Sequence, residues 1–443
     1  MKAKPERTKK SDNSVKEQLA LYTTTPQEKK LIDTTSTFSE NVSLPIHRWF
    51  RYSAGFSALW ARNLISKERA NGRYTVIDPF AGSGTVLLKA ERCGMLGLGL
   101  EAHPFVARIA NVKLFWREDG SIFREYALSI LEQSRRIQGE DTGYPQLIKK
   151  CFPSGTLRRL DSLRRAWEEA ADESPLSELS WLALTSILRE CSPVGTAQWQ
   201  YVLPKKRKAK SVDPFRAFTE KIYLMTDDMF TRQHEEHGPK AVLSREDART
   251  CDSVPDDWAD LLITSPPYAN NYDYADATRL EMSFWGDVQR WGDLQDKVRK
   301  YLVRSCTQHV ASMNRDTYNF IQDENLERIR HEITEVCREL EQEREKHGGK
   351  KPYHTMIAAY FLDMAKVWTA LRRVVKDGGL VCFVVGDSAP YGIYVPVDRW
   401  HGELALSAGF KSFWFEKLRD RNVKWKNRKH RVPLHEGRLW IEG

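Results

Sequence analysis

The chain has 443 residues, of which 41% are hydrophobic and 29% charged, and its formal net charge is +9. This composition is typical of a globular protein, and the length suits two to three domains or one large domain with insertions. No run of 18 apolar residues occurs, and the polar, basic segment 1–30 does not resemble a secretory signal. The seven cysteines contain no C-x-x-C pair, which argues against a disulfide scaffold or a zinc ribbon. We therefore expect a soluble, cytoplasmic protein with no membrane segment and no metal. The modest basic excess permits a nucleic-acid partner without requiring one.

The order of predicted elements indicates an α/β protein. We interpret residues 1–41, rich in Lys, Thr, Ser and Glu, as a flexible basic tail. From Tyr74 onward, strand, Gly-containing turn, helix and strand follow one another at the spacing of parallel βαβ units. The strands expected are 74–77, 96–100, 241–243, 260–263, 380–385, one at 413–415 and one near 439, and the main helices are 56–65, 86–92, 104–113, 355–375 and 397–408. Residues 115–240 and 287–350 are expected to be largely helical. The simplest interpretation is a doubly wound core in residues 42–443, interrupted by these two blocks.

The first motif is D-P-F-A-G-S-G-T at 78–85, where a buried strand turns into a helix. Its glycines allow a ligand to approach the backbone closely, and the following helix offers free N–H groups. Neither the dinucleotide pattern G-x-G-x-x-G nor the lysine of a phosphate-binding loop is present. Glu101 ends the next strand, the position from which a carboxylate commonly holds ribose hydroxyls. A nucleoside ligand without pyrophosphate fits this pattern, and S-adenosylmethionine is the candidate cofactor.

The second motif is T-S-P-P-Y at 264–268, directly after the strand 260–263. Two prolines keep the backbone extended and leave carbonyls that no strand can use. The Ser265 hydroxyl and the Pro266 carbonyl can both accept hydrogen bonds from an exocyclic amino group, and Tyr268 offers a face for stacking. Such acceptors would direct the lone pair of a poorly nucleophilic amino nitrogen toward a sulfonium methyl, so that positioning supplies most of the rate. The base must be flipped out of the duplex to reach this site.

Together the two motifs resemble those of the amino-methylating DNA methyltransferases, which act on cytosine N4 or adenine N6, and the S-P-P-Y form is most similar to the cytosine-N4 branch. The resemblance implies a class I S-adenosylmethionine-dependent methyltransferase fold, a Rossmann-like, mainly parallel sheet of seven strands. It implies Ser265, Pro266, Pro267 and Tyr268 as catalytic residues. It also implies a cofactor site built from three parts of the chain, namely Phe56 and Ser57, then Asp78, Pro79, Phe80, Ala81, Gly82, Gly84, Thr85, Glu101 and Ala102, and finally Asp247 and Ala248. The expected substrate is double-stranded DNA, and the expected setting is a restriction–modification or related defence system with a separate endonuclease.

The sequence leaves alternatives open. Adenine-N6 methylation uses the same chemistry, but those enzymes usually carry Asp or Asn at the position of Ser265. RNA base N-methylation and an inactive nucleic-acid-binding scaffold are further alternatives. A C5-cytosine mechanism is rejected because none of the seven Cys follows a Pro. Which helical block recognises DNA sequence is not decided.

Two basic stretches are candidates for phosphate contact. The first spans residues 205–210, for which phosphate contact is favoured over a solvated loop or a nuclear-import signal. The second combines basic residues with Trp425 between the last two strands. The DNA-binding residues expected from them are Lys205, Lys206, Arg207, Lys208, Lys424, Lys426, Arg428 and Lys429.

Overall fold

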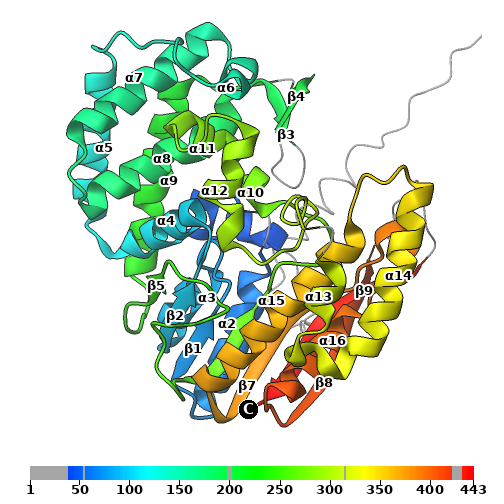
Figure 1. Cartoon of the computed structure of the whole chain (residues 1–443). Coiled ribbons are helices and arrows are strands. Elements are labelled where there is room, and N and C mark those ends of the chain that lie inside the picture. Colours follow the sequence, from blue (N-terminus) through cyan, green and yellow to red (C-terminus); the bar gives the residue numbers. More distant parts are fainter. Residues whose placement is uncertain (1–37, 53–54, 197–201, 209, 314–315, 422–431) are drawn as a thin grey trace, which may run out of the picture. The chain divides into compact units, whose positions relative to one another are not determined.

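The computed structural model describes residues 38–443 except 53–54, 197–201, 209, 314–315 and 422–431. A seven-stranded sheet forms the centre of this part, with the strand order β5-β2-β1-β6-β7-β9-β8 (Figure 1). The strands are β1 (Thr75–Asp78), β2 (Leu96–Leu100), β5 (Val242–Ser244), β6 (Ala259–Thr264), β7 (Val375–Gly386), β8 (Ser412–Arg421) and β9 (Leu434–Glu442). Neighbouring strands from β5 to β7 pair in parallel, whereas β9 is antiparallel to both β7 and β8. This order and direction are those of the class I S-adenosylmethionine-dependent methyltransferase fold, so the predicted fold is confirmed.

Helices cover both faces of the sheet because successive strand residues point to opposite sides. Val76, Leu261 and Ile263 face α2 (Ala58–Ala70) and share one apolar cluster with it. Ile77 and Leu262, one position away, pack instead with α15 and α16 on the other face. Helices α3 (Thr85–Cys93), α4 (Pro104–Lys113), α15 (Tyr353–Val374) and α16 (Val397–Ser407) complete the core. Both faces are therefore buried, as a mainly parallel sheet requires.

The first helical block packs beside the β5 side of the sheet (Figure 1). It contains η3 (Leu114–Arg117), α5 (Gly120–Ser134), α6 (Gln146–Cys151), α7 (Ser154–Ala170), α8 (Pro175–Cys191) and α9 (Pro214–Gln233). The block also contains an antiparallel hairpin of β3 (Val194–Thr196) and β4 (Val202–Arg207). Part of the basic stretch expected as a loop is thus a strand, because backbone pairing with β3 overrides the weak strand preference of its lysines.

The second helical block is made of shorter pieces. It comprises η4 (Trp291–Asp293), α12 (Leu294–Lys297), η5 (Arg299–Tyr301), α13 (Thr317–Ile321), η6 (Glu324–Ile329) and α14 (Arg330–Lys346). Two further short helices, α10 (Tyr274–Ala277) and α11 (Arg279–Trp285), come before the predicted start of this block at residue 287. The remaining 3₁₀ turns are η1 (Phe38–Ser43), η2 (His47–Trp49) and η7 (Pro390–Gly392). Among the described residues, no helix is both long and apolar enough to cross a membrane.

The end of the predicted N-terminal tail is an ordered segment. Residues 38–41 belong to η1 rather than to a flexible tail, whereas residues 1–37 lie outside the described part. The side chain of Asn41 explains this order. Its amide nitrogen donates to the Phe56 carbonyl at 2.9 Å, and its oxygen accepts the Ala58 N–H at 2.9 Å. These long-range bonds attach η1 to the start of α2.

Candidate active site

The two sequence motifs meet at the carboxyl ends of adjacent strands. β1 and β6 are parallel, with Val76 opposite Leu261 and Ile77 opposite Leu262. Asp78 and Thr264, which end the two strands, are therefore neighbours. The Thr264 hydroxyl donates to Asp78 Oδ1 at 2.6 Å, and both side chains are buried. This bond joins the first motif directly to the second.

The loop of the first motif is held by two carboxylates. Asp78 accepts the Phe80 N–H at 3.1 Å, and Glu101 accepts the N–H groups of Gly82 and His103, both at 2.8 Å. Gly82 has φ +52°, and a Cβ there would lie 3.3 Å from the ring of Tyr52. The glycine therefore provides both a left-handed backbone and the space beside that ring.

Burial has the largest effect on the pKa values of Asp78 and Glu101. It raises the pKa of Asp78 to about 7, although the bonds from Thr264 and Phe80 act in the opposite direction. It likewise raises the pKa of Glu101 to about 7 against the bonds from His103 and Gly82. Two buried acids with raised pKa values at one loop form an environment that favours a cationic ligand or hydroxyl donors, since either would stabilise the ionised forms.

One pocket is lined by residues from both motifs. Of the predicted site residues, those that line it are Pro79, Phe80, Gly82, Glu101, Ala102, Asp247, Ala248, Ser265 and Pro267. The sequence interpretation missed six other lining residues, namely Tyr52, His103, Tyr274, Tyr301, Leu302 and Val303. Tyr52 lies four residues before Phe56, the first cofactor residue that the family resemblance implies. The other five carry no local signal that the sequence analysis used, apart from the position of His103 after Glu101.

Asp247 lines the pocket, and its carboxylate is paired with an arginine. Its carboxylate forms an ion pair with Arg249 at 2.6 Å and also accepts the Arg249 N–H at 2.9 Å. Arg249 lies 3.4 Å from Asp363 as well. The arginine therefore orients Asp247, and the remaining lone pairs of the carboxylate are the part that can contact a ligand.

The other predicted cofactor residues lie around the pocket without lining it. Phe56 is buried in the cluster beneath α2, and Ser57 caps α2 by accepting the Trp60 N–H at 3.3 Å. Gly84 is the left-handed N-cap of α3, and Ala81 is buried. Thr85 lines a neighbouring hollow together with Tyr52.

The second motif contributes Ser265 and Pro267 to the pocket lining, whereas Pro266 and Tyr268 do not line it. The Ser265 hydroxyl donates to the Val384 carbonyl at 3.2 Å, so its oxygen keeps lone pairs for another donor. The Tyr274 hydroxyl accepts the Tyr268 N–H at 3.2 Å and thereby fixes the backbone after the two prolines. Pro266 is buried, whereas Ser265, Pro267 and Tyr268 are partly exposed.

Arg421 of β8 is a neighbour of Tyr268 that the motif search did not single out. The centre of its guanidinium lies 5.4 Å from the Tyr268 ring centroid, and its Nη1 donates to the Asp387 carbonyl at 2.8 Å. Burial raises the pKa of Tyr268 above its usual value, and Arg421 opposes that shift. Tyr268 is therefore a neutral ring beside a cation.

The predicted DNA-contact residues differ in their surroundings. Lys205, Lys206 and Arg207 are exposed on β4. Lys208 differs, because its ammonium donates to the Arg189 carbonyl, so part of its hydrogen-bonding capacity is used inside the protein. The remaining predicted residues, Lys424, Lys426, Arg428 and Lys429, lie outside the described residues.

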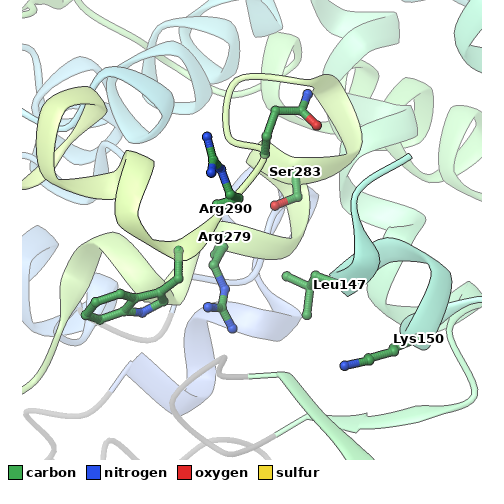
Figure 2. A pocket seen from close by; sticks show the side chains of 7 residues that line it. Leu147, Lys150, Arg279, Ser283 and Arg290 are labelled. Atoms are coloured by element: carbon green, nitrogen blue, oxygen red, sulfur yellow. The ribbon is translucent and has the colours of Figure 1, made fainter. Parts of the chain in front are cut away.

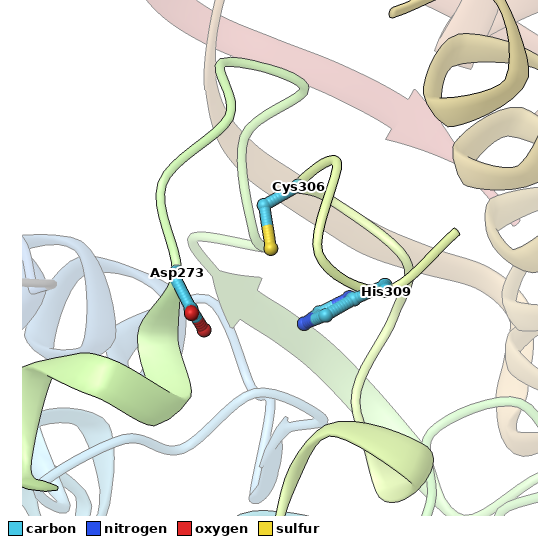
Figure 3. Close-up of side chains that lie close together, drawn as sticks. All are labelled: Asp273, Cys306 and His309. Carbon is cyan, nitrogen blue, oxygen red and sulfur yellow. The ribbon is translucent and has the colours of Figure 1, made fainter. Parts of the chain in front are cut away.

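Among the described residues, two groups of side chains come close enough to suggest a metal site. Asp273, Cys306 and His309 lie close together, as Figure 3 shows, and all three are buried. Asp387, Asp398 and His435 form the second group. Asp273, however, already forms a buried ion pair with Arg299 at 2.7 Å. A dication there would meet the positive guanidinium, so the geometry favours the ion pair as the role of Asp273.

The fold is that of a class I methyltransferase, and one pocket is lined by residues of both sequence motifs. The chain is 26% identical over 446 residues to Type II methyltransferase M.BsoBI of Geobacillus stearothermophilus, a match that covers 88% of this chain and 85% of that protein. It is 27% identical over 405 residues to Type II methyltransferase M.AvaI of Nostoc sp. and of Anabaena variabilis, covering 84% of this chain and 81% of theirs. No family model matches the chain. Type II methyltransferases with this fold use S-adenosylmethionine, and the pocket that Glu101 and Gly82 line offers a carboxylate able to accept hydrogen bonds from ribose hydroxyls.

Proposed function

We propose that this protein transfers a methyl group from S-adenosylmethionine to the exocyclic amino group of a flipped base in double-stranded DNA. The observation that carries the proposal is one pocket lined both by Glu101, which accepts the Gly82 N–H of the first motif, and by Ser265 of the second motif. The two halves of a transfer reaction need such adjacency, because the reacting atoms must approach to about 3–3.5 Å. Similarity to Type II methyltransferases over most of the chain supports the same conclusion.

Within this proposal each residue has a physical task. Glu101 would hold the ribose hydroxyls, and the partly exposed ring of Phe80 would line the cofactor. When bound, S-adenosylmethionine supplies an electrophilic methyl on a sulfonium. Ser265 and the Pro266 carbonyl would accept the amino hydrogens, which localises the nitrogen lone pair toward that methyl. The nitrogen–carbon bond forms as the carbon–sulfur bond breaks, and one amino proton then leaves to solvent.

We further propose cytosine N4 as the target. Ser265 accepts through a neutral hydroxyl whose proton is already donated to Val384. In the resembling family a Ser at this position accompanies cytosine-N4 transfer, whereas Asp or Asn accompanies adenine-N6 transfer. The biological setting we infer is protection of host DNA in the cytoplasm of a prokaryote against a separate restriction endonuclease.

The deciding experiment identifies the modified nucleoside. Purified protein is incubated with labelled S-adenosylmethionine and mixed-sequence duplex DNA, with a transfer-RNA pool in parallel, and the digested products are analysed by mass spectrometry. We expect N4-methylcytosine in DNA, and we expect Ser265→Ala to abolish it while cofactor binding persists. N6-methyladenine would overturn the base assignment and keep the mechanism. Label in RNA alone, or in neither polymer, would overturn the proposed function.

A further inference from the structure

A hollow in the helical part of the chain carries a concentration of positive charge. Its lining, called here the basic hollow, consists of Leu147, Lys150, Arg279, Ser283, Gln289, Arg290 and Trp291 (Figure 2). Figure 2 shows Lys150 on α6 and Arg279 on α11 extending toward the same space from two sides, with Leu147 between them. Three of the seven lining residues are cations, and none is an acid.

Neighbouring carboxylates match this charge only in part. Arg279 forms an ion pair with Asp276 at 3.0 Å. Asp293 lies beside Arg290 and accepts its backbone N–H at 2.9 Å. Within the described residues, Lys150 has no carboxylate within 4.0 Å, and the side chains of Lys150 and Arg290 are both exposed. Cations gathered around a concave surface that no acid lines raise the local potential and attract anions. The basic hollow therefore has the electrostatics of an anion-binding site.

The hairpin β3–β4 extends this positive surface. The Ser192 hydroxyl, just before β3, donates to the carbonyl of Cys151 at the end of α6 with a length of 2.7 Å. This bond places the hairpin base beside the helix that carries Lys150. Lys205, Lys206 and Arg207 on β4 are exposed. A chain of anions could thus contact the hollow and the hairpin at the same time, which a single small anion could not.

The basic hollow is rigidly connected to the catalytic pocket. The Thr278 hydroxyl, next to Arg279, is 3.0 Å from His103 Nε2, and His103 lines the pocket. On the other side of the hollow, the ring of Trp291 lies 4.1 Å from the guanidinium of Arg299. Arg299 in turn pairs with Asp273, the residue before pocket-lining Tyr274. The hollow is therefore held at a set position relative to the site where a base would enter.

We propose that the basic hollow binds phosphodiester groups of the DNA strand whose base enters the catalytic pocket. The proposal rests on the proposed function, because a flipped base stays joined to its backbone and brings the flanking phosphates to the pocket entrance. Lys150 and Arg290 contact phosphate oxygens, and Arg279 does so while keeping Asp276 as its partner. Such contacts position the duplex without reading its sequence.

The test compares two double variants that each lose two positive charges, one variant inside the basic hollow and the other outside it. Lys150→Gln combined with Arg290→Gln removes two of the three cations of the hollow. Arg279 keeps its partner Asp276, and Asp293 keeps the hydrogen bond from the backbone N–H of residue 290. Lys366→Gln combined with Lys411→Gln is the matched control, since both lysines are exposed and lie outside the hollow lining. Lys411 directly precedes β8, whose first residue pairs with the end of β9, and the end of β9 pairs in turn with the first half of β7. Lys411 therefore lies at the amino ends of the parallel strands, whereas the pocket lies at their carboxyl ends. Binding of fluorescent mixed-sequence duplex DNA is measured as a function of KCl concentration.

We expect the hollow variant to reduce the slope of log K against log salt by about 1.8, because each lost phosphate contact accounts for about 0.9. DNA affinity at 0.1 M KCl falls about tenfold or more, whereas the S-adenosylmethionine dissociation constant stays unchanged and shows that the fold is intact. Equal slopes in the hollow and control variants would overturn the proposal. Loss of transfer-RNA binding with unchanged DNA binding would overturn the choice of DNA.

The same samples separate this inference from the proposed function. The wild-type protein could methylate no DNA while the hollow variant still shows a smaller salt dependence of DNA binding than the wild type. In that case the hollow is a phosphate site and the proposed function is wrong. If the wild-type protein methylates DNA and the hollow variant binds DNA like the wild type, the proposed function stands and the hollow assignment fails.

Discussion

Replacing Thr264 with Val removes the hydroxyl that donates to Asp78 and keeps the shape of the side chain. The bond is 2.6 Å long and both residues are buried, so water cannot replace the lost donor. A hydrogen bond to a charged group contributes about 1.5–3 kcal/mol, and one between neutral groups contributes about 0.5–1.5 kcal/mol. Because the Asp78 pKa is raised to about 7 by burial, the cost of the substitution should depend on pH.

The direction of this pH dependence follows from the protonation state of Asp78, because the ionised carboxylate depends on the Thr264 hydroxyl more than the protonated form does. Its folded pKa lies above the unfolded value of about 3.9, so its contribution to stability is fully present below pH 4 and is lost as pH rises through 7. Thr264 limits that loss by stabilising the carboxylate. The Thr264→Val variant should therefore be about 1 kcal/mol less stable than wild type at pH 5.5 and about 2–3 kcal/mol less stable at pH 8.

The assay is urea unfolding followed by tryptophan fluorescence at the two pH values. Thr355→Val is the matched control, because Thr355 is equally buried but shares its bond, 2.8 Å long, with the neutral hydroxyl of Thr317. Its cost should be about 1 kcal/mol at both pH values. If Thr264→Val showed the same pH-independent cost as the control, Asp78 would not ionise near neutral pH and the reasoning would be refuted.

Three further predictions concern the ligands. Tyr268→Ala should lower methyl transfer by roughly 5- to 150-fold, from stacking of about 1–3 kcal/mol per base, with cofactor affinity retained in equilibrium binding; loss of cofactor instead would contradict the division of roles. Gly82→Val should abolish cofactor binding, because its Cβ would lie 3.3 Å from the ring of Tyr52. Gly143 also has a positive φ but has open space around it, so Gly143→Val should leave cofactor binding intact. If calorimetry found the same loss of cofactor affinity in both variants, backbone strain alone would explain the effect of Gly82→Val. Burial raises the pKa of Glu101 to about 7, and the ionised carboxylate is the form that accepts hydrogen bonds from ribose hydroxyls. The cofactor dissociation constant should therefore decrease as pH rises from 6 to 8, and Glu101→Gln should remove this pH dependence.

The local pattern of the sequence predicted the main helices and strands and the α/β class, and the family resemblance implied the seven-stranded sheet. The helix 104–113 begins at Pro104, which suits the first turn of a helix, and the structure has the same bounds. The buried strand before Asp78 and the strand before Ser265 are likewise apolar runs ended by residues that cannot continue a strand. These signals are readable because each depends on residues close together in the chain.

The hairpin β3–β4 and the end of the N-terminal tail were not readable in this way. Strand pairing at Lys205 depends on a partner strand, and the order of η1 depends on bonds from Asn41 to Phe56 and Ala58. In both places an interaction between separate segments outweighs a polar composition that on its own predicts a loop or a flexible tail.

What the sequence alone determined is the position of two short motifs and of the strands that precede them. Only the tertiary structure decided that Tyr52, Tyr274 and Tyr301 line the same pocket as Glu101, and that Phe56 packs inside the core. It also brought cations from α6, α11 and the segment after α11 to one hollow. The physical reason is that a motif is local, whereas a pocket or a charged surface is made by packing elements that are remote in sequence.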